Sequence, residues 1–243
     1  MSFLSRYADD TSAPSVGTAL KNAAVRAIAP GFVLFALITG VGLLLGGPLK
    51  SLGTSEEAAN RSLAAGRTPT WNTITMVWSH IGNTEYVIGV AVLVALAVWW
   101  RTKQWWYAVV PVLAISLQAT IFVIATAVVG RARPEVSHLD PAPPTSSYPS
   151  GHQGASTALY VSLALMASRI KHPVLRTAVV VLCGLAPFLV GYARLYRGMH
   201  HPSDVFMGAI NGILSALLAW GYLRRDGSDG QTRPDRAGGQ TRA

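Results

Sequence analysis

Histidines, arginines and an aspartate gather in three short segments of this chain, and their side chains are suited to phosphate chemistry. The segments are 130–134 (Gly-Arg-Ala-Arg-Pro), 148–152 (Tyr-Pro-Ser-Gly-His) and 193–204 (Ala-Arg-Leu-Tyr-Arg-Gly-Met-His-His-Pro-Ser-Asp). Arginine presents forked donors that match phosphate oxygens, and a neutral imidazole can act as a nucleophile or a base. All three segments border apolar runs, where ionisable groups are costly unless they serve a function.

The middle segment predicts an anion site at the start of a helix. Ser150 stands directly before an apolar run and is suited to cap its N-terminus. The free N–H groups of Gly151 and His152 would then point outward, where a helix start readily binds an anion, and the His152 side chain would donate to the same anion. Arg133 and Arg194, from the other two segments, would stabilise the five-coordinate phosphorus of a transition state.

The third segment predicts a nucleophile and the acid that orients it. Pro202 suits the first position of a helix and Asp204 its first turn, which leaves His200 just outside. From there Asp204 can reach back to one nitrogen of His200, fix its tautomer and leave the other nitrogen free to attack. Because Asp204 cannot orient two adjacent histidines, we do not expect His201 to share this role.

The composition predicts that these segments belong to a membrane protein. Apolar residues make up 51% of the 243 residues and charged residues only 13%, whereas an ordinary soluble domain carries roughly 25% charged residues. Six apolar runs are interpreted as bilayer spans: 27–47, 84–100, 106–129, 152–170, 174–192 and 205–223. We therefore predict an all-α, polytopic membrane protein with six transmembrane helices.

This pattern divides the chain into three parts. The predicted organisation is a cytoplasmic leader (1–26), a six-helix membrane domain (27–223) and a disordered cytoplasmic tail (224–243).

The distribution of positive charge predicts the orientation. With six spans, thirteen of the 20 Lys and Arg residues fall on the side of both termini. By the positive-inside rule both termini are cytoplasmic, in the cell membrane, and the three polar segments lie on the outer side. The net charge of +9 therefore reflects topology, and we expect no nucleic-acid partner. No feature of the sequence indicates an oligomeric state.

Two outer loops would surround the predicted site. In 48–83, apolar and aromatic residues recur at helical spacing from Trp71 to Ile81, which predicts a helix in the membrane interface. In 130–151, five prolines make the loop stiff and non-helical.

Two further residues on the outer side are not assigned to the site. Arg197 is interpreted as an interfacial anchor, and His80 is interpreted as incidental, without a role in the chemistry.

The three segments together resemble the signature of the type 2 phosphatidic acid phosphatase family, also called lipid phosphate phosphatases, which reads K-x6-R-P, P-S-G-H and S-R-x5-H-x3-D. The resemblance covers about residues 126–204 directly. It implies that His200 forms a phosphohistidine, that Asp204 orients His200, and that His152 acts as acid and then as base. It also implies a phosphate cradle without metal or cofactor, made by Arg133, Ser150, Gly151 and Arg194.

Two positions depart from the family pattern. Thr126 stands where the family has lysine, and Ala193 stands where it has serine. The loss of the lysine removes a positive charge near phosphate, where charge matters in a dry site. Arg131, two residues before Arg133, is the candidate substitute.

The expected function is hydrolysis of a lipid phosphomonoester or pyrophosphate, such as a polyprenyl pyrophosphate, phosphatidic acid or phosphatidylglycerol phosphate. One alternative is a lipid phosphotransferase that uses the same histidine, and another is an inactive lipid-phosphate binder or carrier. A further alternative interprets His152, His200, His201 and Asp204 as metal ligands, in which case chelators would abolish activity.

Overall fold

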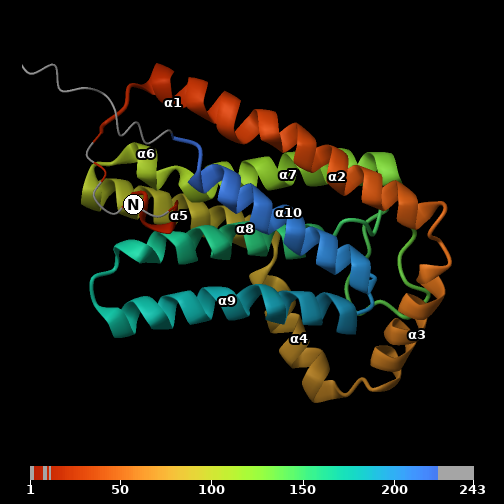
Figure 1. Cartoon of the computed structure of the whole chain (residues 1–243). Helices are drawn as coiled ribbons and strands as arrows, with labels where there is room; N and C mark the ends of the chain where they lie inside the picture. Colours follow the sequence, from red (N-terminus) through yellow and green to blue (C-terminus); the bar gives the residue numbers. More distant parts are fainter. Residues whose placement is uncertain (1–2, 8–9, 11, 224–243) are drawn as a thin grey trace, which may run out of the picture.

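The computed structural model describes residues 3–7, 10 and 12–223, and within these ranges it contains helices and loops but no β-strand. The predicted all-α class is confirmed. The long helices lie side by side, with α3 (Leu52–Ala65) and α4 (Pro69–Ile81) projecting at one end (Figure 1). The predicted tail, 224–243, lies outside the described residues.

Five stretches of the described residues have the length and apolar composition needed to cross a membrane. They are α1 (Val16–Ala23) continuing through a π-helical turn (Ala24–Ile28) into α2 (Ala29–Gly46), α5 (Thr84–Thr102), α6 (Trp105–Ala108) with α7 (Val110–Val129), α9 (Pro173–Tyr196) and α10 (Pro202–Trp220). The first helix begins at Val16 and therefore extends into the predicted leader. Short 3-10 turns lie at Phe3–Ser5 and Ala167–Arg169.

Helix α8 (Gly151–Met166) occupies the predicted fourth span and is shorter than expected. Sixteen residues rise about 24 Å, less than the ~30 Å of a bilayer core. Helices α7, α9 and α10 pack around it, and each residue from Gln153 to Leu159 is buried. It is thus a central helix of the bundle, and a sixth membrane crossing stays a prediction.

Close approach of α8 and α10 brings the middle and third polar segments together. A Cβ atom on Gly208 would lie 2.5 Å from the Ser150 carbonyl oxygen, and one on Gly212 would lie 2.5 Å from the Gly154 carbonyl oxygen. Only glycine leaves room for this crossing. A backbone hydrogen bond from Ser150 N to Asp204 O, 3.0 Å long, joins the two helix starts.

The loop between α2 and α5 forms two helices where one was predicted. Helix α3 spans Leu52–Ala65 and α4 spans Pro69–Ile81. Gly66 ends α3, and Thr68 caps α4 by accepting from the Trp71 N–H. Helix α4 packs against α9, where Trp71 and Trp78 both contact the Tyr192 ring.

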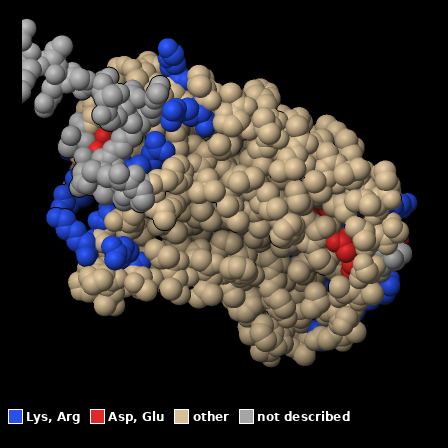
Figure 2. Space-filling view, viewed as in Figure 1, with Lys and Arg blue, Asp and Glu red and all other residues tan. Residues whose placement is uncertain are grey.

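On the face shown in Figure 2, the surface has two charged ends with an uncharged belt between them. Lys and Arg gather at the end where α1 begins, and the broad belt between the two ends shows almost no charge on the face in Figure 2. At the opposite end α8 and α10 begin, α7 and α9 end, and α3 and α4 project (Figure 1). All three polar segments of the sequence meet at that opposite end.

Candidate active site

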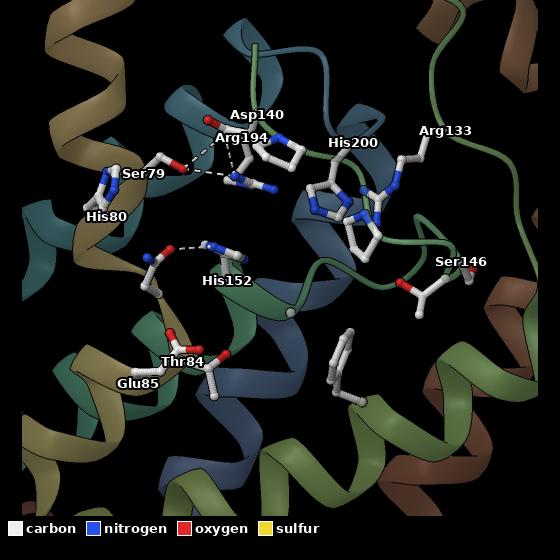
Figure 3. A pocket seen from close by; sticks show the side chains of 16 residues that line it. Ser79, His80, Thr84, Glu85, Arg133, Asp140, Ser146, His152, Arg194 and His200 are labelled. Atoms are coloured by element: carbon white, nitrogen blue, oxygen red, sulfur yellow. Dashed lines mark hydrogen bonds and ion pairs between the residues drawn. The ribbon is translucent and has the colours of Figure 1, made fainter. Parts of the chain in front are cut away.

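A cavity of about 470 Å³ lies where the three segments meet. Five residues predicted from the sequence line it, namely Arg133, Gly151, His152, Arg194 and His200. The labelled side chains of His152, Arg194 and His200 point into a common space (Figure 3). The structure therefore brings together residues that are distant in the sequence; Arg133 and His200, for example, are 67 positions apart.

His200 presents one nitrogen with a free lone pair. The residue is only 4% exposed, and its Nδ1 lies 2.6 Å from the Ser147 carbonyl oxygen. Because a carbonyl oxygen only accepts, Nδ1 carries the proton and Nε2 of the neutral ring is unprotonated. Burial, together with the positive charges of Arg194 and Arg133, holds the pKa of His200 well below its ordinary value. The ring is therefore neutral at physiological pH and able to attack.

The prediction that Asp204 hydrogen-bonds His200 is wrong in this structure. Asp204 Oδ2 lies 4.0 Å from His200 Nδ1 and instead accepts from the His201 backbone N–H at 2.8 Å and from His201 Nδ1 at 3.1 Å. Asp204 sits at the third position of α10, and its carboxylate reaches back to the backbone N–H of His201, the residue that caps this helix. The local helix cap therefore engages the carboxylate, and the Ser147 carbonyl fixes the tautomer of His200.

Helix α8 begins as the sequence predicts. Ser150 is its N-cap and its hydroxyl accepts from the Gln153 N–H. The Ser150 side chain is fully buried behind the cavity, whereas Gly151 and His152 line it. His152 Nε2 donates to Asn83 Oδ1 at 2.8 Å, a partner that the sequence did not reveal.

Two arginines bring positive charge to the cavity. Arg133 Nη1 donates to the Met199 carbonyl at 2.7 Å, and Arg194 Nη1 donates to Ser79 Oγ and Asp140 Oδ2, both at 2.8 Å (Figure 3). The Nε atoms of both arginines are buried without a hydrogen-bond partner among the described residues. Buried donors without partners are costly, so this arrangement suits an anion with several acceptor oxygens.

Asp140 is a site residue that sequence reasoning missed. Its Oδ1 accepts from Arg197 Nε at 2.8 Å and Nη2 at 2.7 Å, while its Oδ2 accepts from Arg194. Burial raises the pKa of Asp140, but the hydrogen bond from Arg197 and the charges of both arginines lower it further, so the pKa lies below its ordinary value. Arg197 is buried in this contact and is not an interfacial anchor.

Arg131, the candidate substitute for the missing lysine, does not line the cavity. Its guanidinium pairs with Asp204 Oδ1 and Glu56 Oε2, both at 2.6 Å. Thr126 does not line the cavity either, since its hydroxyl donates to the Tyr148 carbonyl at 3.2 Å. His80, expected to be incidental, lines the cavity from the end of α4.

Comparisons with known proteins agree on the fold and the family. The chain matches the PAP2 superfamily over residues 105–228. It is 24% identical over 173 residues to phosphatidylglycerophosphatase B of Bacillus subtilis (strain 168), covering 70% of this chain and 83% of that protein.

Two solved structures share the arrangement of helices. The crystal structure of a transmembrane PAP2-type phosphatidylglycerolphosphate phosphatase from Bacillus subtilis superposes with a TM-score of 0.68 at 21% identity, covering 83% of this chain and 98% of that one. Aquifex aeolicus LpxE gives a TM-score of 0.52 at 22% identity, covering 66% of this chain and 91% of that one. The family match spans more than half of the chain and includes all three polar segments, so this protein belongs to the PAP2 superfamily.

Proposed function

We propose that this protein removes phosphate from a membrane lipid by way of a phosphohistidine on His200. The observation that carries the proposal is the buried His200 ring, whose Nδ1 proton is held by the Ser147 carbonyl and whose Nε2 is left unprotonated in a cavity shared with Arg133 and Arg194. A nucleophile beside two arginines suits the attack on a phosphate group.

In the first step His200 Nε2 attacks phosphorus and the bond between phosphorus and the lipid oxygen breaks. His152 starts this step with both ring nitrogens protonated, and because its Nε2–H is held by Asn83, it gives its Nδ1 proton to the departing oxygen, which would otherwise leave as an alkoxide. Arg133 and Arg194, together with the start of α8 at Gly151, stabilise the equatorial oxygens of the five-coordinate phosphorus.

In the second step His152, now neutral, takes a proton from water, which attacks the phosphorus of the phosphohistidine. The bond between phosphorus and Nε2 breaks, inorganic phosphate leaves, and His200 returns to its neutral form. Asn83 holds the His152 ring through Nε2 and so positions this acid and base.

The site lies at the outer face of the membrane, with both termini in the cytoplasm. This orientation is supported by the gathering of Lys and Arg at the end of the molecule opposite the cavity (Figure 2). Phosphatidylglycerol phosphate is the first substrate to test, since a curated relative bears the name phosphatidylglycerophosphatase B.

The test is phosphate release by the purified protein from phosphatidylglycerol phosphate, phosphatidic acid and a polyprenyl pyrophosphate. We expect free phosphate to appear in proportion to the lipid consumed, and His200→Ala to lose roughly 10³-fold or more of kcat. Lipid loss without phosphate would indicate a phosphotransferase, and wild-type protein inactive on every lipid would indicate a binder.

A further inference from the structure

The side chains of two consecutive residues on α3 bridge the same two loops. Glu56 Oε2 accepts from Arg131 Nη2 at 2.6 Å, while its Oε1 accepts from the Ser203 N–H at 2.8 Å. Glu57 Oε1 accepts from His201 Nε2 at 3.0 Å, and its two oxygens accept from the Glu135 N–H at 3.3 and 3.2 Å. Each carboxylate thus joins segment 131–135 to segment 201–203.

These two segments carry the phosphate-binding arginine and the nucleophile. Arg133 lies between the two points at which 131–135 is held, and His200 directly precedes 201–203. A displacement of about 1 Å between reacting groups can lower a rate on the order of 10²-fold. The carboxylates of α3 are therefore placed to set the distance between Arg133 and His200.

Apolar packing does little to hold α3 in place. Among its described side chains only Asn60 is buried, and the sequence of the helix, Leu52–Ala65, is mostly small and polar. Glu56 and Glu57 are its half-buried acidic residues, and both face the catalytic loops. The polar contacts of these two residues attach α3 to the two loops of the site.

His201 joins this contact as a doubly protonated ring. Its Nδ1 faces Asp204 Oδ2 at 3.1 Å and its Nε2 faces Glu57 Oε1 at 3.0 Å. Ionised carboxylates only accept hydrogen bonds, so both nitrogens must carry protons. Burial and the charge of Arg131 lower the pKa of His201, but the hydrogen bonds and charges of Asp204 and Glu57 raise it further, to above its ordinary value.

We propose that Glu56 and Glu57 are positioning residues that clamp the Arg133 loop to the His200 loop, and that the clamp is complete while His201 carries both protons. This inference rests on the proposed phosphatase activity. The clamp comes from a part of the chain that precedes the region matching the family, 105–228.

The first test measures kcat and KM of the full-length protein with Glu56→Ala/Glu57→Ala. We expect kcat to fall on the order of tenfold to a hundredfold with KM changed by less than about threefold, because alignment is lost while the cavity remains. Glu135→Gln is the matched control: its side chain lines a neighbouring cavity, and only its backbone N–H enters the clamp. Unchanged kcat in the double variant would overturn the proposal.

The second test uses pH. Glu57→Gln keeps an oxygen that can accept from His201 but removes the negative charge, so His201 loses its second proton at a lower pH. We expect most of kcat to be rescued at low pH and the alkaline limb of the profile to move to lower pH, with no such shift in Glu135→Gln. An alkaline limb that stays in place in Glu57→Gln would contradict the role of His201.

The third test does not depend on turnover. Hydrogen exchange of the Ser203 and Glu135 amides should be slow in the wild type and faster in Glu56→Ala/Glu57→Ala. Unchanged exchange would refute the clamp, and faster exchange without a fall in kcat would refute its positioning role. A different outcome is slow exchange of these amides in a wild-type protein that releases no phosphate from any lipid. That outcome would refute the proposed phosphatase function, and with it the role of the clamp in positioning Arg133 and His200.

Discussion

The Nδ1 atom of His200 lies 2.6 Å from the carbonyl oxygen of Ser147. Ser147 is itself fixed to the first polar segment, because its N–H donates to the Arg131 carbonyl and its hydroxyl donates to the Ala132 carbonyl, both at 2.8 Å. The proline-rich loop therefore sets the tautomer of His200 through a backbone group. Because this carbonyl belongs to the backbone, it remains in place when Asp204 is substituted. A variant at Asp204 therefore tests which of the two groups orients His200.

Asp204→Asn should lower kcat only on the order of tenfold to a hundredfold, because the Ser147 carbonyl still holds Nδ1–H of His200. Loss of an acid that alone fixes the tautomer of a catalytic histidine costs about 10⁴-fold in kcat. Steady-state kinetics on a lipid phosphate decides between these values, with thermal unfolding as the control for folding. A loss near the larger value would show that Asp204, and not Ser147, orients the ring during turnover.

The pH profile should show activity that persists below the ordinary histidine range. His200 attacks only when neutral, and its pKa is lowered by burial and by Arg194 and Arg133. Protonation therefore sets in only as the pH falls below about 6.5, the ordinary value for histidine. The measurement is kcat/KM against pH. Arg133→Gln removes one of the neighbouring charges and should move the acidic limb to higher pH, and a limb that stays in place would argue against this electrostatic cause.

Arg131 and Arg133 should differ in their effect on phosphate binding. Arg133 lines the cavity with an unpartnered Nε, whereas Arg131 is paired with Asp204 and Glu56 outside it. Arg133→Gln should weaken inhibition by vanadate, a five-coordinate analogue, by about tenfold or more. Arg131→Gln should lower kcat with little change in the vanadate inhibition constant. If both variants weakened inhibition by vanadate equally, Arg131 would have to be a phosphate ligand as well.

Asp140→Asn should lower both activity and stability, since Asp140 pairs with two buried arginines, Arg194 and Arg197. The folded-state pKa of Asp140 is lowered, so its contribution to stability is present above about pH 3.9 and is lost as the pH falls through the folded value. Thermal unfolding against pH should show this acid-dependent loss in the wild type and a smaller loss in Asp140→Asn. Identical pH dependence of unfolding in both proteins would show that the pairing of Asp140 with Arg194 and Arg197 does not stabilise the fold.

Much of the site is predictable from the sequence because its residues lie at helix ends. Ser150 before an apolar run marks the start of α8, and Pro202 marks the start of α10, so the positions of His152 and His200 follow from local signals. Gly66, Thr68 and Pro69 are local signals for the end of α3 and the start of α4, whereas the helical spacing from Trp71 to Ile81 predicted α4 alone.

The remaining site residues depend on packing between distant segments. Ser79 and Asn83 reach the cavity from α4 and the start of α5, and Asp140 reaches it from the proline-rich loop. Nothing in their local sequence marks them as partners of Arg194 or His152. The engagement of Asp204 by His201 was missed for a different reason, since a helix cap competes with the catalytic histidine for the same carboxylate.

Trapping the phosphoenzyme would show directly whether His200 is the nucleophile. Wild-type protein mixed with phosphatidylglycerol phosphate carrying a radiolabelled terminal phosphate, then quenched rapidly in base, should hold an acid-labile label that peptide mapping assigns to His200. His200→Ala should hold none. Turnover by the wild type without any label on His200, or sustained turnover by His200→Ala, would contradict the account.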